Sequence, residues 1–329
     1  MFKGKKVLIT GGTGSLGVAL TKRLLKTQVS TIRIYSRDEW KQTRMSEELR
    51  DNRLRFLIGD IRDKERLSRS MENIDIVFHT AALKHVPIGE YNPFEAIKTN
   101  VIGSQNVVEA CLTNGISKAI AIGTDKAVSP LNTYGATKLL MEKIFTSANF
   151  YKGKSSPEFL CVRYGNVLGS RGSILPKFLE QIGMRNEINI TDPKMTRFNI
   201  TMTQAVDLVF RALNYGRAGE IFVPKLKAYT VGIMKEAVLD LVNKKVKEKR
   251  IPVRPGEKYH EMLISDGEIS WTSETKLDYI IQNPGVENIV FRQPPRFKKT
   301  KLKEPYASNK VELVTKEELR NIIINEGLL

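Results

Sequence analysis

Residues 6–17 read KVLITGGTGSLG, and this stretch decides the fold. A short apolar run ends in regularly spaced glycines, Gly11, Gly14 and Gly17, and an amphipathic helix is predicted directly after it over Leu16–Lys26. Gly11 permits a tight turn, Gly14 lets backbone approach a phosphate, and Gly17 lets helix and strand pack closely. A strand, a glycine turn and a helix N-terminus in this order predict a site for the pyrophosphate of a dinucleotide.

The same alternation continues outward along the chain. Further runs rich in Val, Ile, Leu and Phe lack polar alternation, as expected of parallel strands covered on both faces. Helical patterns lie between them, so we predict an α/β fold with a Rossmann-like, doubly wound parallel sheet. The predicted strands are Lys6–Thr10, Thr31–Tyr35, Leu54–Ile58, Ile74–Phe78, Ala119–Ile122 and Phe159–Arg163, and the predicted helices are Leu16–Lys26, Lys64–Met71, Pro93–Asn114 and Tyr134–Tyr151.

The pattern changes after about residue 170, where helices such as Leu175–Gln181 and Thr203–Tyr215 mix with short extended segments. We therefore predict a dinucleotide-binding domain over residues 1–170, to which later segments can return. Residues 171–329 are expected to form mainly a smaller C-terminal substrate-binding lobe and a tail.

Composition narrows the class of protein. The net charge of +17 would suit a nucleic-acid binder, but the Lys and Arg residues are spread along the chain, so we expect a solvated surface and no nucleic-acid partner. No membrane span and no secretion signal are recognisable, which predicts a cytoplasmic protein. Cys111 and Cys161 lie in apolar runs and the histidines lack ligand spacing, so we expect buried thiols and no metal.

The end of the second predicted strand indicates which dinucleotide binds. An NAD site usually has an acidic residue there, which binds the ribose 2′-hydroxyl. Here Ser36 and Arg37 come first, and a guanidinium offers a planar fork of donors to a 2′-phosphate. We therefore predict NADP, while Asp38 leaves NAD open as the alternative.

Other predicted cofactor contacts come from the turns after the first, third and fourth strands. Asp60 is placed to bond the adenine amino group, with a turn cap as its alternative role. Small residues after strand four let backbone lie along the cofactor. The set is completed by Thr13, Ser15, Leu16, Lys41, Ile61, Ala81 and Ala82.

A second group of residues carries the chemistry. Tyr134 and Lys138 are one helical turn apart, and an ammonium near a phenol favours the phenolate. Such a tyrosine can remove a hydroxyl proton while hydride leaves the same carbon. Thr124, Asp125 and Lys126 follow strand five, where ligands bind, so they are expected to face the cofactor and Tyr134. They would add the removal of a proton and the protonation of a leaving group.

These segments together resemble the inverting UDP-N-acetylglucosamine 4,6-dehydratases, which are extended short-chain dehydrogenases/reductases. Members of this family make the first intermediate of pseudaminic acid and of related surface sugars. The resemblance spans about residues 2–265 and is carried by GGTGSLG (11–17), IYSRDE (34–39), AALKHVP (81–87), TDKA (124–127), NTYGATK (132–138) and RYGNVLGSRGS (163–173).

The resemblance implies a mechanism. Tyr134 takes the proton of the sugar 4-hydroxyl while hydride passes from C4 to NADP⁺. Lys126, as a neutral amine, then removes the C5 proton, and Asp125, protonated, donates to the departing 6-hydroxyl. Hydride returns to C6, and reprotonation of C5 from the opposite face inverts that centre. We expect neighbouring cations or desolvation to lower the pKa of Lys126.

The resemblance also implies the binding partners. UDP-N-acetylglucosamine would be held by a mainly basic set of side chains, which suits its diphosphate. The family implies a homo-oligomer, either a dimer or a hexamer. The residues assigned to the substrate are Lys84, Asn166, Val167, Arg171, Ile174, Lys177, Arg254 and Glu257, of which Lys84 and Asn166 are also assigned to the cofactor, as are Thr124, Tyr134 and Lys138.

Several alternatives stay open. Retaining dehydratases carry Glu where this chain has Lys126, and 4-epimerases lack the acid–base pair, so a retaining dehydratase or a UDP-sugar 4-epimerase is the first alternative. A non-catalytic NADP-binding protein is the second, and a nucleic-acid binder is the third. Asp125 and Lys126 would then be a surface ion pair.

Overall fold

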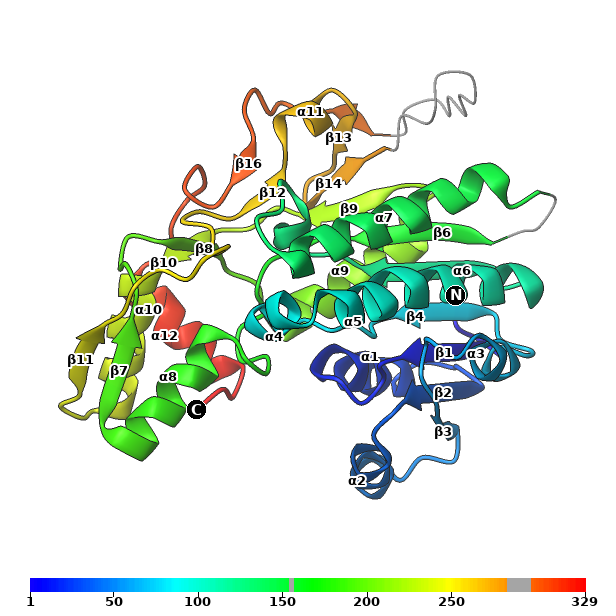
Figure 1. The fold of residues 1–329 in the computed structure, drawn as a ribbon, viewed down its shortest axis with the longest axis horizontal. Coiled ribbons are helices and arrows are strands. Elements are labelled where there is room, and N and C mark those ends of the chain that lie inside the picture. The colour runs from blue at the N-terminus through cyan, green and yellow to red at the C-terminus, as the bar shows by residue number, and fades with distance from the viewer. Residues whose placement is uncertain (154–156, 283–296) are drawn as a thin grey trace.

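The computed structural model describes residues 1–153, 157–282 and 297–329. Its centre is a sheet in the order β15-β13-β14-β9-β6-β5-β4-β1-β2-β3 (Figure 1). The strands from β3 to β9 pair in parallel, and the three at the other edge are antiparallel. The strand order 3-2-1-4-5-6 is that of a Rossmann sheet, which confirms the predicted fold class. The bounds are β1 Lys6–Thr10, β2 Thr31–Ser36, β3 Leu54–Ile58, β4 Ile76–His79, β5 Lys118–Ile122, β6 Glu158–Val162, β9 Ile221–Pro224, β13 Thr272–Glu274, β14 Asp278–Ile281 and β15 Lys298–Lys299.

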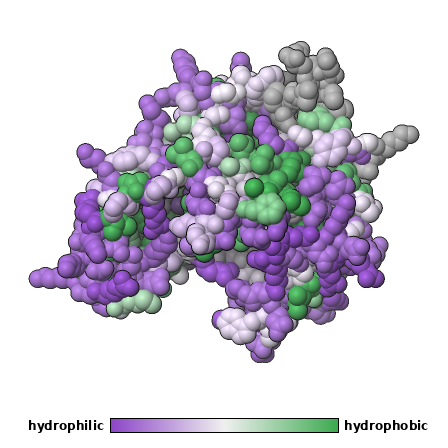
Figure 2. All heavy atoms as spheres, viewed as in Figure 1, coloured by the Kyte–Doolittle hydropathy of each residue, from purple (hydrophilic) through white to green (hydrophobic). Residues whose placement is uncertain are grey.

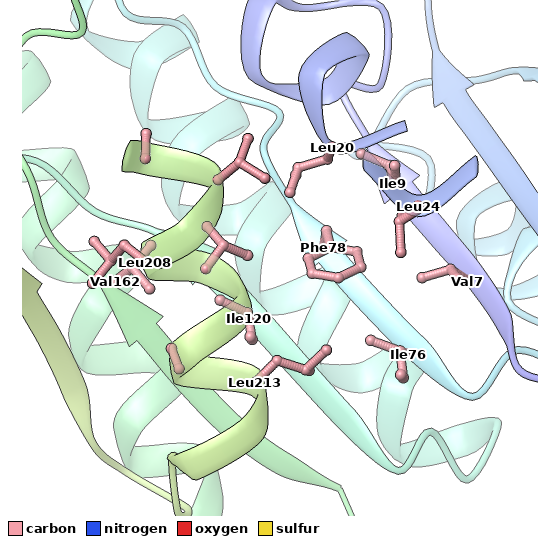
Figure 3. Packing of buried hydrophobic residues seen from close by; sticks show 14 of the residues in the cluster. Val7, Ile9, Leu20, Leu24, Ile76, Phe78, Ile120, Val162, Leu208 and Leu213 are labelled. Carbon is pink, nitrogen blue, oxygen red and sulfur yellow. The ribbon is translucent and has the colours of Figure 1, made fainter. Parts of the chain in front are cut away.

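Helices cover both faces of this sheet. Successive strand residues point to opposite faces, so Leu8 and Ile9 belong to two different hydrophobic clusters. Figure 3 shows the cluster in which Leu20 and Leu208 pack toward Phe78 of the sheet. Burial on both faces explains the apolar runs of the central strands, such as Val7–Ile9 and Ile76–Phe78. The helices are α1 Ser15–Leu25, α2 Glu39–Leu49 and α9 Met202–Tyr215 on one face, and α3 Lys64–Ser70, α6 Gly103–Thr113 and α7 Thr133–Tyr151 on the other.

The predicted strands match the observed ones within two residues, but several helices differ from the prediction. The helix predicted over Pro93–Asn114 is divided into α5 (Pro93–Ile97), a wide turn η1 (Lys98–Ile102) and α6. Helices α2 and α4 (Val86–Tyr91) were not predicted, and neither were the helices over residues 231–242, 266–269 and 316–325.

A smaller lobe beside the sheet has its own hydrophobic cluster. It contains α8 (Ile174–Arg185), α10 (Val231–Val242) and α12 (Lys316–Asn325). Segments beyond residue 170 also return to the main sheet, since α9, β9, β13, β14 and β15 belong to it. The remaining elements are α11 Asp266–Ile269, η2 Asp125–Ala127 and the strand pairs β7 Glu187–Ile190 with β11 Lys247–Arg250, β8 Thr196–Phe198 with β10 Ala228–Thr230, and β12 Met262–Ile264 with β16 Tyr306–Ala307.

The face seen in Figure 2 is largely hydrophilic and carries a hydrophobic patch near α5 and α7. Exposed apolar side chains from this region are Ile88, Phe94, Ile97, Ile102 and Leu140. Within the described ranges, none of the helices has the length and hydropathy needed to cross a membrane.

Candidate active site

A cavity of about 1240 Å³ lies at the carboxyl ends of the parallel strands, where the lobe faces the sheet. Ligands of open α/β sheets bind at this edge. Most of the predicted site residues line the cavity, but Gly17, Asp125 and Ile174 do not. The predicted residues that line it are Gly11, Thr13, Gly14, Ser15, Leu16, Ser36, Arg37, Asp38, Lys41, Asp60, Ile61, Ala81, Ala82, Lys84, Thr124, Lys126, Tyr134, Lys138, Asn166, Val167, Arg171, Lys177, Arg254 and Glu257.

The glycine loop fits a pyrophosphate. Gly14 is the N-cap of α1 and, among the described residues, no side chain caps this helix, so its first-turn N–H groups are left to a ligand. Gly17 lies beneath the loop, because a Cβ there would overlap the backbone of Gly12. Gly17 therefore brings α1 against the strand and does not face the cavity.

Of the charged side chains that follow β2, Asp38 is hydrogen-bonded within the chain, whereas Arg37 is not within hydrogen-bond distance of its nearest carboxylate, Asp60. Asp38 caps α2 by accepting from the Lys41 N–H at 3.0 Å, and it also pairs with the Lys41 ammonium. These hydrogen bonds lower the pKa of Asp38. Asp60 accepts from Arg62 Nε at 2.9 Å and Nη2 at 2.7 Å. Arg37 lies 3.7 Å from Asp60, beyond hydrogen-bond range, so its guanidinium is the one still available to a phosphate.

Tyr134 and Lys138 lie in the first two turns of α7, which begins with Asn132 accepting from the Gly135 N–H at 2.8 Å. A Cβ on Gly135 would overlap the Lys126 carbonyl, so glycine lets α7 approach the loop after β5. Burial lowers the pKa of Lys138 to about 8. The Lys138 ammonium donates to Met141 Sδ at 2.9 Å.

The loop after β5 places an amine between oxygen atoms. Lys126 Nζ donates to Asp125 Oδ1 at 3.0 Å and to Asn166 Oδ1 at 3.0 Å. Asp125 Oδ1 also accepts from the Thr124 hydroxyl at 2.9 Å. Asp125 is 1% exposed and does not line the cavity, whereas its neighbours Thr124 and Lys126 do.

The electrostatics of this loop also differ from the expectation. Burial by itself lowers the pKa of Lys126, but the charges of Asp125 and Glu261 outweigh it and raise the pKa above its usual value. Burial raises the pKa of Tyr134, opposed by the Lys126 charge and a hydrogen bond with Thr124. The main cation acting on the phenol is thus Lys126, where the sequence had suggested Lys138.

The lobe brings further cations to the cavity. Lys84 Nζ donates to the Arg171 carbonyl at 3.0 Å, and Arg171 Nη2 donates to the Thr13 carbonyl at 3.1 Å. These contacts join the lobe-side loop to the glycine loop. Burial lowers the pKa of Lys177, and the charge of nearby Arg254 lowers it further. Ile174 instead packs against the lobe's own cluster.

The segment before β12 contributes residues that sequence reasoning missed. Glu261 Oε1 lies 3.7 Å from Lys126 Nζ, and Lys258 Nζ donates to the carbonyls of Asp125 and Val128. Arg197, on β8, also lines the cavity and donates to Glu257 at 3.0 Å. A single acid directly before the apolar run 262–264 was the available signal for Glu261.

Arg163, Glu142 and Glu268 form an ion triad that connects α7 to α11. Arg163 is 1% exposed and donates to Glu142 at 2.7 Å and to Glu268 at 2.9 Å. Glu142 lies on the helix that carries Tyr134, and Glu268 lies on α11. The triad therefore links the helix of the candidate site to the segment that follows Glu261.

Comparison with known proteins adds a family. Residues 7–283 match the family described as polysaccharide biosynthesis protein. The chain is 47% identical over 283 residues to the UDP-N-acetylglucosamine 4,6-dehydratase (inverting) of Campylobacter jejuni subsp. jejuni serotype O:23/36. The matched region covers 85% of this chain and 84% of that relative. The chain is also 40% identical over 330 residues to a UDP-glucose 4-epimerase of Rickettsia bellii. This match covers 99% of the chain and 97% of that relative.

A solved structure resembles the whole chain. The X-ray structure of Pen from Bacillus thuringiensis has a TM-score of 0.93 and 40% sequence identity. The likeness covers 100% of this chain and 99% of that one, the C-terminal tail included.

Proposed function

Because the chain belongs to the polysaccharide biosynthesis protein family, we propose that it is an NADP-dependent UDP-N-acetylglucosamine 4,6-dehydratase that inverts C5. It would be a hydro-lyase whose product is UDP-2-acetamido-2,6-dideoxy-β-L-arabino-hex-4-ulose. The relative from Campylobacter jejuni supports this reaction. The observation that carries the proposal is the Lys126 amine, which is hydrogen-bonded to Asp125 and Asn166 and lines the same cavity as Tyr134.

The chain's own residues supply the proton transfers. Tyr134 is half-buried at the cavity wall and would remove the 4-hydroxyl proton, helped by the Lys126 charge and Thr124. A C4 ketone makes the C5 hydrogen acidic, and Lys126 as a neutral amine would remove it. Asp125 would protonate the departing 6-hydroxyl. Thr124 is hydrogen-bonded to Asp125 Oδ1 and lines the cavity, so a protonated Asp125 would donate to the Thr124 oxygen while the Thr124 hydroxyl turns and gives its own proton to the departing 6-hydroxyl.

The cofactor residues fit a dinucleotide with a 2′-phosphate. NADP, when bound, would accept hydride from C4 and return it to C6. The first turn of α1 and the glycine loop would hold the pyrophosphate, with Gly11, Gly14 and Ser15 against it. Arg37 would receive the 2′-phosphate, because Asp38 is engaged by Lys41 and is not free for a ribose hydroxyl.

The substrate would lie between the sheet and the lobe. Lys84, Arg171 and Lys177 offer cations to the diphosphate, and Arg254 with Glu257 would hold the nucleoside side. Burial lowers the pKa of Lys84, with the Arg171 charge acting in the same direction. An anionic diphosphate would relieve this crowding of cations, which favours a nucleotide-activated substrate over a neutral one.

A UDP-sugar 4-epimerase is the second candidate, because the Rickettsia bellii relative over 99% of the chain bears that name. An epimerase needs only the oxidation and reduction at C4. The ion pair between half-buried Lys126 and buried Asp125 would then have no step to perform, although burying charged groups is costly.

Incubation of the purified protein with UDP-N-acetylglucosamine and NADP tests the proposal. We expect loss of water and a 4-keto-6-deoxy product by mass spectrometry. Lys126→Ala should abolish this product while cofactor affinity stays within about twofold, and Lys143→Ala, which removes an exposed lysine of α7, should retain it. Formation of the 4-epimer without loss of water would favour the second candidate.

The wider biology follows the same proposal. We propose a homo-oligomer, dimer or hexamer, and exposed Ile88, Phe94 and Leu140 support it. Light scattering after gel filtration measures its mass. The product would enter the synthesis of pseudaminic acid or related surface sugars, and the cytoplasmic location and the lack of a nucleic-acid partner stay predictions.

A further inference from the structure

Glu261 is a buried carboxylate to which the mechanism above gives no task. It is 2% exposed and lines the cavity. Its Oε1 lies 3.7 Å from Lys126 Nζ and 3.7 Å from Arg197 Nε. Its Oε2 is buried without a hydrogen-bond partner in the part of the chain that the structure describes. Because buried polar atoms are nearly always paired, this free oxygen indicates a role beyond packing.

Three oxygen atoms surround the Lys126 amine, and they differ in what they can do. Asn166 contributes an amide oxygen, which holds the amine but does not take its proton. Asp125 accepts from Thr124 through Oδ1 and does not line the cavity, although its Oδ2, like Glu261 Oε2, is buried without a partner among the described residues. Glu261 is the carboxylate that shares the cavity wall with Lys126, and it has an oxygen free to accept.

The charges around this pair come from several elements. Asp125 and Tyr134 face Lys126 from η2 and α7, and Arg197 and Tyr229 face it from the paired strands β8 and β10. Lys258 lies on the same segment as Glu261, and Lys84 approaches from the loop after β4.

Two opposing effects act on the protons of this pair. Burial raises the pKa of Glu261, opposed by Lys126. With both carboxylates ionised, Lys126 retains its proton and has no lone pair for the C5 hydrogen. Substrate that displaces water from the cavity lowers the local dielectric, which favours a neutral amine and carboxyl over the ion pair.

We propose that Glu261 is a positioning residue whose charge draws the Lys126 amine toward it. It takes the spare proton of the amine once the 3.7 Å gap between Oε1 and Nζ closes to hydrogen-bond distance, so that Lys126 reacts as a neutral base. This inference rests on the function proposed above. In the transfer, one N–H bond of Lys126 breaks and an O–H bond forms on Glu261. The free electron pair on Nζ then takes the C5 proton. The proton stays within the pair, so the total charge of the pair does not change before the sugar reacts.

A pH profile separates this role from a purely structural one. In the wild type, the proton passes inside the pair, so the single-turnover rate should be nearly constant over about pH 7–9. In Glu261→Gln, Lys126 must lose its proton to solvent, so the rate should rise about tenfold per pH unit over that range. At pH 7 the variant should be slower than the wild type by roughly tenfold or more.

Two variants control the experiment. Glu261→Asp keeps a carboxylate and should restore most of the flat profile. Glu268→Gln removes a carboxylate of the Arg163 triad without touching Lys126, so its profile should run parallel to the wild type. A Glu261→Gln profile that is lowered equally at every pH would overturn the inference.

A second readout does not need turnover. Trace acetylation of Lys126 in the cofactor-loaded protein, followed by mass spectrometry, reports its titration directly. Loss of the neighbouring charge should move the Lys126 midpoint to lower pH by about one unit or more in Glu261→Gln. If the wild type leaves UDP-N-acetylglucosamine unchanged, the proposed function fails, and this midpoint still decides the inference. An unmoved midpoint would contradict it.

Discussion

Replacement of Arg37 by alanine should turn the protein from an NADP binder toward one that does not discriminate between the two dinucleotides. Arg37 lies 3.7 Å from Asp60 and is 57% exposed, while Arg62 already holds Asp60 with two hydrogen bonds. Removing Arg37 therefore leaves Asp60 in place. The adenine end of the site should be preserved, and only the 2′-phosphate should lose a partner.

The size of the effect follows from this geometry. A hydrogen bond to a charged group contributes roughly 1.5–3 kcal/mol. Because the guanidinium is more than half exposed, solvent and salt reduce this to about 1–2 kcal/mol. At about 1.4 kcal/mol per tenfold change, NADP should bind about 5- to 30-fold more weakly, and NAD should change by less than about twofold.

Titration calorimetry with both dinucleotides measures the two affinities. Arg62→Ala is the matched control, since it removes a nearby arginine whose charge is engaged by Asp60 and Glu95. It should weaken both dinucleotides to a similar degree. Equal weakening of NADP and NAD by Arg37→Ala would refute the assignment of the 2′-phosphate to Arg37.

Three further predictions concern the scaffold and its protons. Gly17→Ala should abolish cofactor binding and lower stability, because the added Cβ overlaps the Gly12 backbone. Gly183→Ala has open space around the added Cβ and should change neither property. An intact cofactor site in Gly17→Ala would contradict the packing argument. Arg163→Met should lower the free energy of unfolding in denaturant by roughly 3–5 kcal/mol, since it leaves Glu142 buried without its partner. Lys22→Met removes an exposed ion pair with Glu48 and should lower it by less than about 1 kcal/mol. Equal losses would show that burial of the triad is unimportant. Burial lowers the pKa of Lys138 from 10.5 to about 8. Between these two pH values the folded state binds fewer protons than the unfolded state, so the cofactor-free protein should gain stability as the pH rises from about 8 to 10.5. Lys138→Met should lose this gain, and parallel stability curves for the two proteins would exclude it.

The strands were predictable because both faces of the sheet are buried. The strand Lys6–Thr10 has the apolar run Val7–Ile9 at its centre, and its observed bounds agree with the predicted ones. Helix α2 was missed because few of its side chains, Gln42 and Met45 among them, are buried, so the apolar stripe that marks a helix is too weak. Asp38, its N-cap, was interpreted only as an alternative ribose partner.

The protons of the site could not be predicted, because they depend on groups that are distant in sequence. Lys126 was expected to have a lowered pKa, and burial alone would have that effect. Folding brings Glu261 from the segment before β12 to within 3.7 Å, and its charge acts in the opposite direction. Arg163 likewise was assigned only to a strand end, since nothing local indicates that Glu142 and Glu268 converge on it.

The C5 centre of the sugar tests the central claim most directly. Purified protein is incubated with UDP-N-acetylglucosamine and cofactor in deuterated water, and the product is examined by NMR. If Lys126 removes the C5 proton and that centre is reprotonated from the opposite face, the 4-keto-6-deoxy product carries deuterium at C5 with inverted configuration. A product with protium at C5, or with the original configuration there, would contradict the account.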